Sequence, residues 1–595
     1  MRRITRRLPQ PVLDLIQWAD AANAVPLSAD RVPGAEGDEL RRLAALGALA
    51  RELATPVIKE WPEPLASWAW DADVTVDASV AAAVREALRS NDVDVLALTY
   101  EHVVSGVNRR RLGTFFTPAP IVRYMIQQCK YLFHESPKHV VDPGAGVGAF
   151  TLAALAAWPA ATVTAVDVNI VTLGLLAARA PVDAAVQRRL VLAPTDYLVW
   201  LQEQWCTLQG PRLILGNPPY TRHQCMTGKE KVAAKEVAGD LITSGLAGLS
   251  AYFLAATLKA LKPSDAACFL LPSSWCETRY GRELREWLWK ATKRRIEVQF
   301  FPSEIAVFPG TQVAAMILII GPEQGEDQIF LSYSLGLQND EVKPLGRQII
   351  QSDRYKACPS TFTELLRTRK RMPIRASVRL GDVVRIRRGV ATGGSSFFFI
   401  NDITREEFGL PSNVLRSALV KPAHCTGIRF DVREHVRLGS IGLPRWLLDL
   451  NNSDAAILEG ATAKYLVRGR ELGVDKRHLT SHRPEWYLVE PVKPPDLFLV
   501  PVGKPFHRVI INDARAVGSN NFHGLYLSKD APWPKERLAY WLMSGEGLRR
   551  LADLGRHYHG GSLKIEPGAL RTLEIPEKLA TLHDIEDWPH ETSAT

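Results

Sequence analysis

The chain has 595 residues, more than one hydrophobic core normally organises, so we expect about two to four domains. Its hydrophobic content of 46% and charged content of 23% are typical of globular proteins, no apolar run is long enough to span a membrane, and the net charge of +9 permits a nucleic-acid partner. The seven cysteines form no Cys-x-x-Cys pair, so neither a zinc site nor a disulfide framework is expected. No other metal site is expected. The N-terminal arginines lack a following apolar core, which favours a cytoplasmic protein over a secreted one.

Residues 1–107 carry helical patterning without recognisable catalytic residues. Leucines recur every third residue from Leu40 to Leu49, which places them on one helical face. The tryptophan-rich segment 61–70 contains prolines and predicts a packed loop. No paired acidic and lysine cluster typical of a nuclease is found here. We therefore predict an N-terminal helical accessory region.

The segment Phe116-Thr117-Pro118 follows three consecutive arginines. Thr117 is a suitable N-cap and Pro118 a suitable first-turn residue for a helix whose apolar face runs from Ile121 to Ile126. Taken alone, the segment is simply the start of a capped helix.

Residues 139–150 predict a strand, a glycine-rich turn and the start of a helix. Glycines let the backbone approach a ligand closely, and the N-terminus of the following helix faces that ligand. A turn of this kind is weak evidence by itself. The residues of interest are Asp142, Pro143, Gly144, Gly146, Gly148 and Phe150.

Three further strands follow, and each leads to a polar residue. The strand 161–166 leads to Asp167, the strand 190–192 to Asp196 and Tyr197, and the strand 213–216 to Asn217. This series predicts a parallel sheet with the polar residues at one edge, where open α/β sheets bind ligands. An acidic residue after the second strand can accept hydrogen bonds from ribose hydroxyls.

The tetrapeptide Asn217-Pro218-Pro219-Tyr220 suits the methylation of an amino group on an aromatic ring. The Asn217 side-chain oxygen and the Pro218 carbonyl are two acceptors that can take both N–H hydrogens, which frees the nitrogen lone pair for attack. Pro219 stiffens the loop, and Tyr220 can stack on a flat ring. A proline-rich turn after a strand is the simpler alternative.

The order of these motifs resembles the gamma class of amino methyltransferases that modify DNA adenine at N6, especially the Taq-type enzymes of restriction-modification systems. The resemblance implies that Phe116, Thr117 and Pro118 form the N-terminal cofactor motif, and that residues 142–150 form the methionine-binding loop of S-adenosylmethionine. It implies that Asp167 binds the ribose and that Asp196, followed by Tyr197, contacts the adenine of the cofactor. Residues 217–220 would be the catalytic tetrapeptide.

Two downstream positions extend the resemblance. Phe253 matches a family position near the cofactor, although Ser250 replaces an aromatic residue that is usual there. Phe308 would stack on the face of the flipped base opposite Tyr220. Polar and apolar residues alternate from Leu380 to Gly394, as in a half-buried strand. From Val378 the chain resembles the start of the family's target-recognition domain.

The predicted fold is α/β, with a Rossmann-like S-adenosylmethionine-dependent methyltransferase sheet and a C-terminal mixed α+β target-recognition domain. The expected domains are a helical region (1–107), a catalytic domain (108–325), a linker (326–377), a DNA target-recognition domain (378–580) and a tail (581–595). The predicted function is site-specific transfer of a methyl group to N6 of a flipped adenine in double-stranded DNA, in a restriction-modification or phage-defence system. A cognate restriction endonuclease is an expected partner.

Three alternatives remain open from the sequence. A family that methylates a glutamine amide in proteins shares the tetrapeptide, an RNA adenine methyltransferase would need similar residues, and a bifunctional restriction enzyme would add a nuclease part. The large basic C-terminal region favours a DNA substrate over a protein substrate. The N-terminal region is short for a nuclease and lacks its residues.

Overall fold

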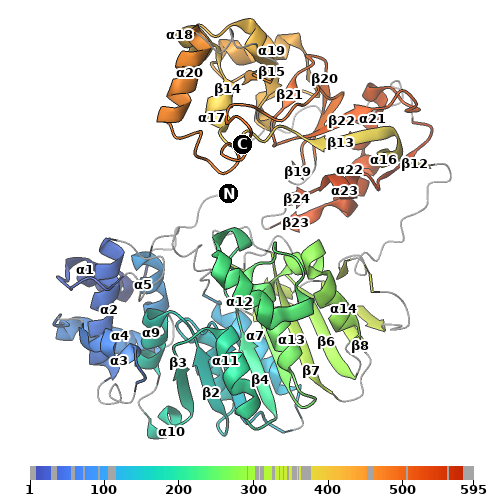
Figure 1. Ribbon diagram of the computed structural model, residues 1–595. Helices are drawn as coiled ribbons and strands as arrows, with labels where there is room; N and C mark the ends of the chain where they lie inside the picture. The colour runs from blue at the N-terminus through green and yellow to red at the C-terminus, as the bar shows by residue number, and fades with distance from the viewer. Residues whose placement is uncertain are drawn as a thin grey trace. The chain divides into compact units, whose positions relative to one another are not determined.

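The computed structural model divides the chain into two compact units, Met1–Thr368 and Arg369–Thr595 (Figure 1). The described residues are 8–28, 37–54, 61–71, 74–90, 94–104, 116–133, 135–180, 183–290, 293–301, 307–308, 314–323, 328–333, 335–338, 341–344, 348–351, 358–359, 361–362, 377–451, 460–503, 507–558 and 562–579. No helix within these ranges combines the length and the apolar character that a membrane crossing requires. The expected tail, 581–595, lies outside the described residues.

The described part of the first unit contains a nine-stranded sheet in the order β11-β8-β6-β7-β5-β4-β1-β2-β3. Strands β1 to β5 pair in parallel, whereas β7 is antiparallel to both β5 and β6. The bounds are β1 (His139–Pro143), β2 (Thr162–Val166), β3 (Leu190–Ala193), β4 (Arg212–Gly216), β5 (Ala266–Pro272), β6 (Arg294–Phe300), β7 (Ala315–Glu323), β8 (Gln328–Tyr333) and β11 (Gln348–Gln351). The predicted Rossmann-like α/β fold is confirmed.

Helices cover both faces of this sheet, as parallel strands require. Successive residues of β4 alternate between two cores: Leu213 and Leu215 pack in the core that holds α7 and α8, and Ile214 packs in the core that holds α11, α13 and α14. The bounds are α7 (Ala119–Lys130), α8 (Ala149–Ala157), α11 (Tyr197–Gln204), α13 (Leu249–Ala260) and α14 (Arg282–Lys290), with the short α10 (Ala184–Gln187) before β3.

The strand order changes direction at β1, which lies between β2 and β4. The chain runs outward from β1 through β2 to β3 and then returns to the other side of β1 with β4. Such a switch point leaves a crevice at the carboxyl ends of the two strands, since the following segments leave in opposite directions. The glycine-rich turn after β1 and the tetrapeptide after β4 therefore face the same crevice.

The N-terminal helices share a core with α9 (Ile170–Arg179) and do not form a separate unit (Figure 1). The packed loop predicted over 61–70 is wrong in its second half, because a helix begins directly after Pro64, whose missing N–H costs nothing before a first turn. The bounds are α1 (Gln10–Ala21), α2 (Asp38–Ala54), α3 (Leu65–Asp71), α4 (Ala78–Ser90) and α5 (Val95–Val103).

The segment expected to be a linker contains strands. Strand β8 pairs in parallel with β6, and β11 pairs antiparallel with β8, so both extend the main sheet. Strands β9 (Leu335–Gln338) and β10 (Glu341–Pro344) form a hairpin between them. The linker prediction is therefore wrong for these strands, because short apolar runs such as Ile329–Leu331 find an open sheet edge to pair with. Residues 363–376 lie outside the described residues.

The second unit mixes short strands and helices, as predicted. Its first and last described strands, β12 and β25, pair with each other. The strand predicted from Leu380 begins only at Val384, after one helical turn. The bounds are β12 (Ser377–Arg379), α16 (Leu380–Val383), β13 (Val384–Arg388), α17 (Ser395–Phe398), β14 (Phe399–Ile400), α18 (Asp402–Phe408), β15 (Leu415–Leu419), β16 (Arg429–Phe430), α19 (Val432–Ser440), β17 (Trp446–Leu448), α20 (Gly460–Glu471), β18 (Leu497–Leu499), β19 (Val502–Gly503), β20 (Val509–Asn512), β21 (Val517–Gly518), β22 (His523–Leu527), α21 (Lys535–Met543), α22 (Gly545–Leu554), β23 (Arg556–Tyr558), β24 (Ser562–Lys564), α23 (Pro567–Leu570) and β25 (Glu574–Pro576).

Candidate active site

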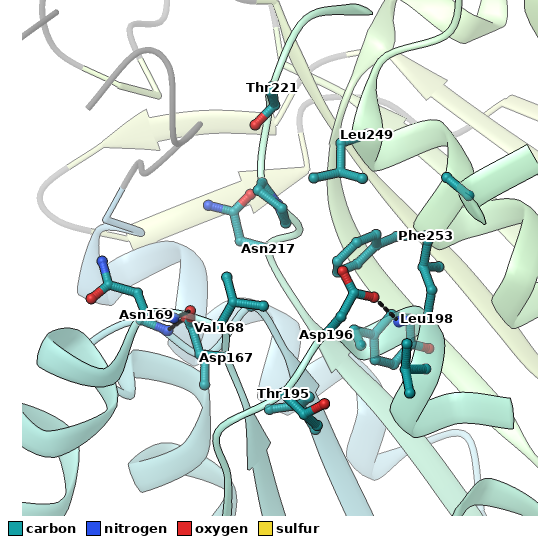
Figure 2. Close-up of a pocket in the computed structure, with 18 of the residues that line it drawn as sticks. Asp167, Val168, Asn169, Thr195, Asp196, Leu198, Asn217, Thr221, Leu249 and Phe253 are labelled. Carbon is teal, nitrogen blue, oxygen red and sulfur yellow. Dashed lines mark hydrogen bonds between the residues drawn. The ribbon is translucent and has the colours of Figure 1, made fainter. Parts of the chain in front are cut away.

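A cavity of about 610 Å³ lies at the carboxyl ends of β1 to β4 (Figure 2). Eleven of the residues singled out in the sequence line it: Phe116, Thr117, Gly144, Gly146, Phe150, Asp167, Asp196, Tyr197, Asn217, Pro219 and Phe253. Seven others lie outside its wall: Pro118, Asp142, Pro143, Gly148, Pro218, Tyr220 and Phe308. The structure thus brings most of the predicted residues together around one space.

The glycine-rich turn between β1 and α8 forms one wall of the cavity. The backbone N–H of Gly146 donates to Asp167 Oδ2 at 2.7 Å, which ties the turn to the end of β2. Gly148 has a φ of +85°, and a Cβ there would lie 2.0 Å from Leu176 Cδ1 on α9. Only glycine fits at this position, because both the backbone conformation and the close helix exclude a side chain.

Asp142 lies behind the turn and supports it. The side chain is buried, and its Oδ2 accepts hydrogen bonds from the backbone N–H and the hydroxyl of Thr151, at 3.0 and 2.7 Å. Its Oδ1 has no hydrogen-bond partner among the described residues. Burial raises the pKa of Asp142 to about 7. A Cβ on Gly216 would lie 2.8 Å from this oxygen, so the residue before the tetrapeptide must be small.

Asp167 and Asn169 form the wall after β2. Asp167 Oδ1 accepts from the backbone N–H of Asn169 at 2.8 Å. Asn169 is buried and caps α9, since its Oδ1 accepts from the N–H groups of Val171 and Thr172. Burial raises the pKa of Asp167, although its hydrogen bonds act in the opposite direction. The carboxylate is therefore held in place by backbone donors on both of its oxygens.

Asp196 and Tyr197 follow β3. Asp196 caps α11 through a 2.7 Å hydrogen bond from the N–H of Leu198 to its Oδ1 (Figure 2). The Tyr197 hydroxyl is hydrogen-bonded to Thr257 Oγ1 at 2.8 Å. The centroids of the Tyr197 and Phe253 rings are 4.8 Å apart. Burial raises the pKa of Tyr197. Only part of Tyr197 faces the cavity, since its hydroxyl is used in the core.

Asn217 directly follows β4, whose five residues are all buried. Its Nδ2 donates to Thr117 Oγ1 at 3.1 Å. The predicted N-cap is therefore displaced by one residue: Pro118 occupies that position of α7, and the Thr117 hydroxyl bonds to Asn217 instead. This bond joins two motifs that both line the cavity.

Tyr220 and Phe308 contact each other beside the tetrapeptide. Their ring centroids are 5.6 Å apart and the ring planes are nearly perpendicular, at 88°. Both rings are buried in the core that contains α7. The residues expected to flank a flat ring are adjacent, but in this arrangement their faces are not parallel. They must separate before a ring can enter between them.

The cavity wall also contains residues that the sequence analysis did not include. Helix α12 (Gly228–Ala238) and the turn before it contribute Cys225, Met226, Thr227 and Glu230. A signal was present, because Thr227 and Glu230 form a capping box that marks the start of a helix. Among the described residues, no group of three or more His, Cys, Asp or Glu side chains is arranged to hold a metal ion.

Comparison with known families gives two matches. The model of the Eco57I restriction-modification methylase matches residues 209–308, which contain the tetrapeptide and Phe308. The model of the C-terminal domain of Type II methyltransferase M.Eco57I matches residues 363–592. Together they support the resemblance to gamma-class DNA methyltransferases of restriction-modification systems.

Individual relatives agree with these families. The chain is 28% identical over 482 residues to Type II methyltransferase M.XamI of Xanthomonas campestris pv. amaranthicola, covering 80% of this chain and 86% of the relative. It is 22% identical over 483 residues to Type II methyltransferase M.AccI of Acinetobacter calcoaceticus, covering 79% and 86%. The solved structure of the Type IIL restriction-modification enzyme MmeI in complex with DNA has the same fold, with a TM-score of 0.54, 13% identity and coverage of 89% of this chain and 79% of that one.

Proposed function

We propose that this restriction-modification DNA methyltransferase transfers a methyl group from S-adenosylmethionine to N6 of an adenine that has left the base stack of double-stranded DNA. The observation that carries the proposal is the place of Asn217, which stands on the wall of the same cavity as Asp167 and Asp196. The proposed cofactor site and an amide suited to an amino group would thus be next to each other.

The residues present fit S-adenosylmethionine. The glycine turn offers backbone that no Cβ obstructs, and Asp167 and Asp196 place carboxylates after two neighbouring strands. Asp167 would accept from the ribose hydroxyls, and Phe253 would pack against the cofactor's adenine. When bound, the cofactor supplies a methyl group activated by a sulfonium centre.

Asn217 and Pro218 would hold the target amino group. Thr117 binds Nδ2 of Asn217, and this fixes the rotation of the amide and directs Oδ1 away from Thr117. That oxygen and the Pro218 carbonyl would each accept one N6 hydrogen, which keeps the nitrogen lone pair out of conjugation with the ring. Attack by this nitrogen needs alignment more than a strong base.

Tyr220 and Phe308 would flank the flipped adenine. Their rings contact each other edge to face beside the tetrapeptide. An entering adenine would part the rings and exchange that contact for stacking on two faces. Base–aromatic stacking is typically worth about 1–3 kcal/mol per base, enough to help offset the cost of unstacking.

Residues 378–580 would recognise the DNA sequence. On β13, Arg385 and Arg387 are exposed on one face while Val384 and Ile386 on the other face are buried, so this edge strand presents a basic face. Arginines suit both phosphates and base edges. The MmeI structure, which has this fold, contains DNA. We expect the chain to act on host DNA in the cytoplasm, alongside a cognate restriction endonuclease.

The test is methyl transfer from labelled S-adenosylmethionine to DNA, RNA and protein in parallel, followed by mass spectrometry of the digested product. We expect label in DNA alone, as N6-methyladenine. Label in RNA or in a glutamine side chain, or a different methylated base in DNA, would overturn the proposal. A parallel reaction with magnesium and no cofactor tests for nuclease activity.

A further inference from the structure

Helix α9, which begins at the cavity wall, is bonded at both ends to α5 of the N-terminal region. At its start, Asn169 Nδ2 donates to Tyr100 Oη at 2.7 Å. At its end, Arg179 forms an ion pair at 2.6 Å with Asp94, the N-cap of α5. Between them Gly174 packs against Trp68 so closely that a Cβ would lie 2.1 Å from the indole ring. The N-terminal helices therefore hold α9 along its length.

Asn169 can face Tyr100 in only one orientation. Its Oδ1 accepts from the N–H groups of Val171 and Thr172, so Nδ2 is the atom directed at the tyrosine. Its backbone N–H donates to Asp167 Oδ1. A chain of hydrogen bonds thus runs from the Tyr100 hydroxyl through one residue to the carboxylate at the cavity wall.

The Tyr100 ring reaches a second part of the site. It contacts Phe116 edge-to-face, with centroids 5.9 Å apart and planes at 78°. Phe116 lines the cavity, and a Cβ on Gly146 would lie 3.7 Å from its ring. Tyr100 itself is completely buried and is not part of the cavity wall. It therefore supports the two sides of the site without touching what binds there.

We infer that Tyr100 is a positioning residue of the cofactor site and that the N-terminal helical region sets cofactor affinity through it. The inference rests on the proposed use of S-adenosylmethionine. The Tyr100 hydroxyl holds the Asp167–Asn169 turn, and the Tyr100 ring holds Phe116. The region is therefore a part of the methyltransferase machinery, although its sequence contains no cofactor-binding motif.

The test is Tyr100→Phe in the full chain, because this change removes the hydroxyl and keeps the ring. We expect the dissociation constant of S-adenosylmethionine, measured by calorimetry without DNA, to rise about 3- to 10-fold, as for one neutral hydrogen bond. The kcat at saturating cofactor should not change. 5′-Methylthioadenosine, which has the ribose but no amino-acid tail, should lose affinity by the same factor.

Tyr465→Phe is the matched control. The Tyr465 hydroxyl donates to the carbonyl of Phe397 at 2.8 Å in the core of the second unit. Its loss removes a comparable buried hydrogen bond and should leave cofactor affinity unchanged. In the double variant Tyr100→Phe with Asn169→Ser, we expect no further loss of affinity beyond that of Asn169→Ser alone, since the two residues act through one bond.

The outcomes separate the inference from the proposed function. A wild-type chain that does not bind S-adenosylmethionine overturns the proposed function and this inference with it. A wild-type chain that binds, with equal affinity in Tyr100→Phe, overturns only the inference. If Tyr100→Phe does not fold, Asn169→Ser breaks the same hydrogen bond from the side of the cavity wall, because serine keeps a capping oxygen but cannot reach Tyr100. Unchanged affinity in that variant contradicts the inference.

Discussion

Thr117 and Asn217 show how a single hydrogen bond can prepare an amide for its task. They come from different motifs, 100 residues apart, and meet in the cavity wall. A free carboxamide can rotate and present either its oxygen or its nitrogen. By accepting from Nδ2, Thr117 selects the orientation in which Oδ1 points away from it. Under the proposed function this oxygen accepts from the target amino group, so the acceptor would be in place before the substrate arrives.

Asn217→Ala should lower the rate of methyl transfer by on the order of 10²–10³, because one preorganised acceptor is lost where the nitrogen becomes positive. The affinities for DNA and cofactor should remain, since that interaction is strongest in the transition state. Single-turnover methylation is the measurement. A fluorescent base analogue at the target should still flip in this variant and flip less in Tyr220→Ala. Near-normal turnover by Asn217→Ala would show that the tetrapeptide is not the active site.

Asp142 should make stability depend on pH. Its pKa is about 7 in the folded chain against 3.8 for the unperturbed group, so the folded state keeps a proton that the unfolded state releases. The free energy of unfolding should therefore fall as the pH rises from about 4 to about 7 and level off above that, by up to about 4 kcal/mol at 1.36 kcal/mol per unit.

Asp142→Asn should remove most of this slope, because an amide does not titrate. Urea unfolding at several pH values compares the two proteins. Burial also raises the pKa of Asp167, so this residue adds a slope of the same sign in both proteins. Its contribution therefore cancels in the difference between the wild-type chain and Asp142→Asn. Identical slopes in the two proteins would contradict the assignment to Asp142.

Helix α9 is the element through which the sheet and the N-terminal helices share one core. Its residues are almost all buried, so it has no solvent-facing side and must be covered by other helices. Small residues allow that cover to approach: Gly174 faces Trp68, and Gly148 faces Leu176. The position of the Asp167–Asn169 turn is thereby set by packing on both sides of the helix.

Gly174→Ala should lower the free energy of unfolding by about 1–3 kcal/mol, because the new methyl group would overlap a buried indole that has no room to move. Gly228→Ala is the control. Gly228 is the first residue of helix α12, and a Cβ there meets nothing within 4 Å. The free energy of unfolding of Gly228→Ala should therefore be unchanged or slightly higher. Equal denaturation midpoints for the two variants would show that Trp68 does not constrain α9.

The chain as a whole separates into two units with cores of their own. The first unit holds the cavity and all of the predicted cofactor and catalytic residues. The second unit, which the family model of the M.Eco57I C-terminal domain matches, holds the basic strand β13. This division separates the chemistry of methyl transfer from the proposed reading of DNA.

Residues 1–368 expressed alone should bind S-adenosylmethionine with the affinity of the full chain and should lose specific DNA binding. Calorimetry measures the first property, and competition between specific and nonspecific DNA at fixed salt measures the second. A fragment that still selects the same DNA site as the full chain would place recognition in the first unit.

The sequence by itself determined the motifs and their order. The glycine turn, Asp167 and the tetrapeptide directly follow apolar strands, and Asp196 comes shortly after one, so the pattern is local to a short stretch of chain. Because parallel strands bring their carboxyl ends to one edge, the clustering of these residues followed from the order of elements alone. The helix that contains Leu40–Leu49 was equally readable from its periodicity.

Only the tertiary structure decided which of those residues touch one another. A hydrophobic pattern shows which face of an element is buried but not which other face covers it. The bonds from Asn217 to Thr117 and from Asn169 to Tyr100 join residues far apart in the chain, as does the contact of Tyr220 with Phe308. Strands β8 and β11 likewise acquired their place from an open sheet edge. Such partners depend on how the elements pack, and packing exists only in three dimensions.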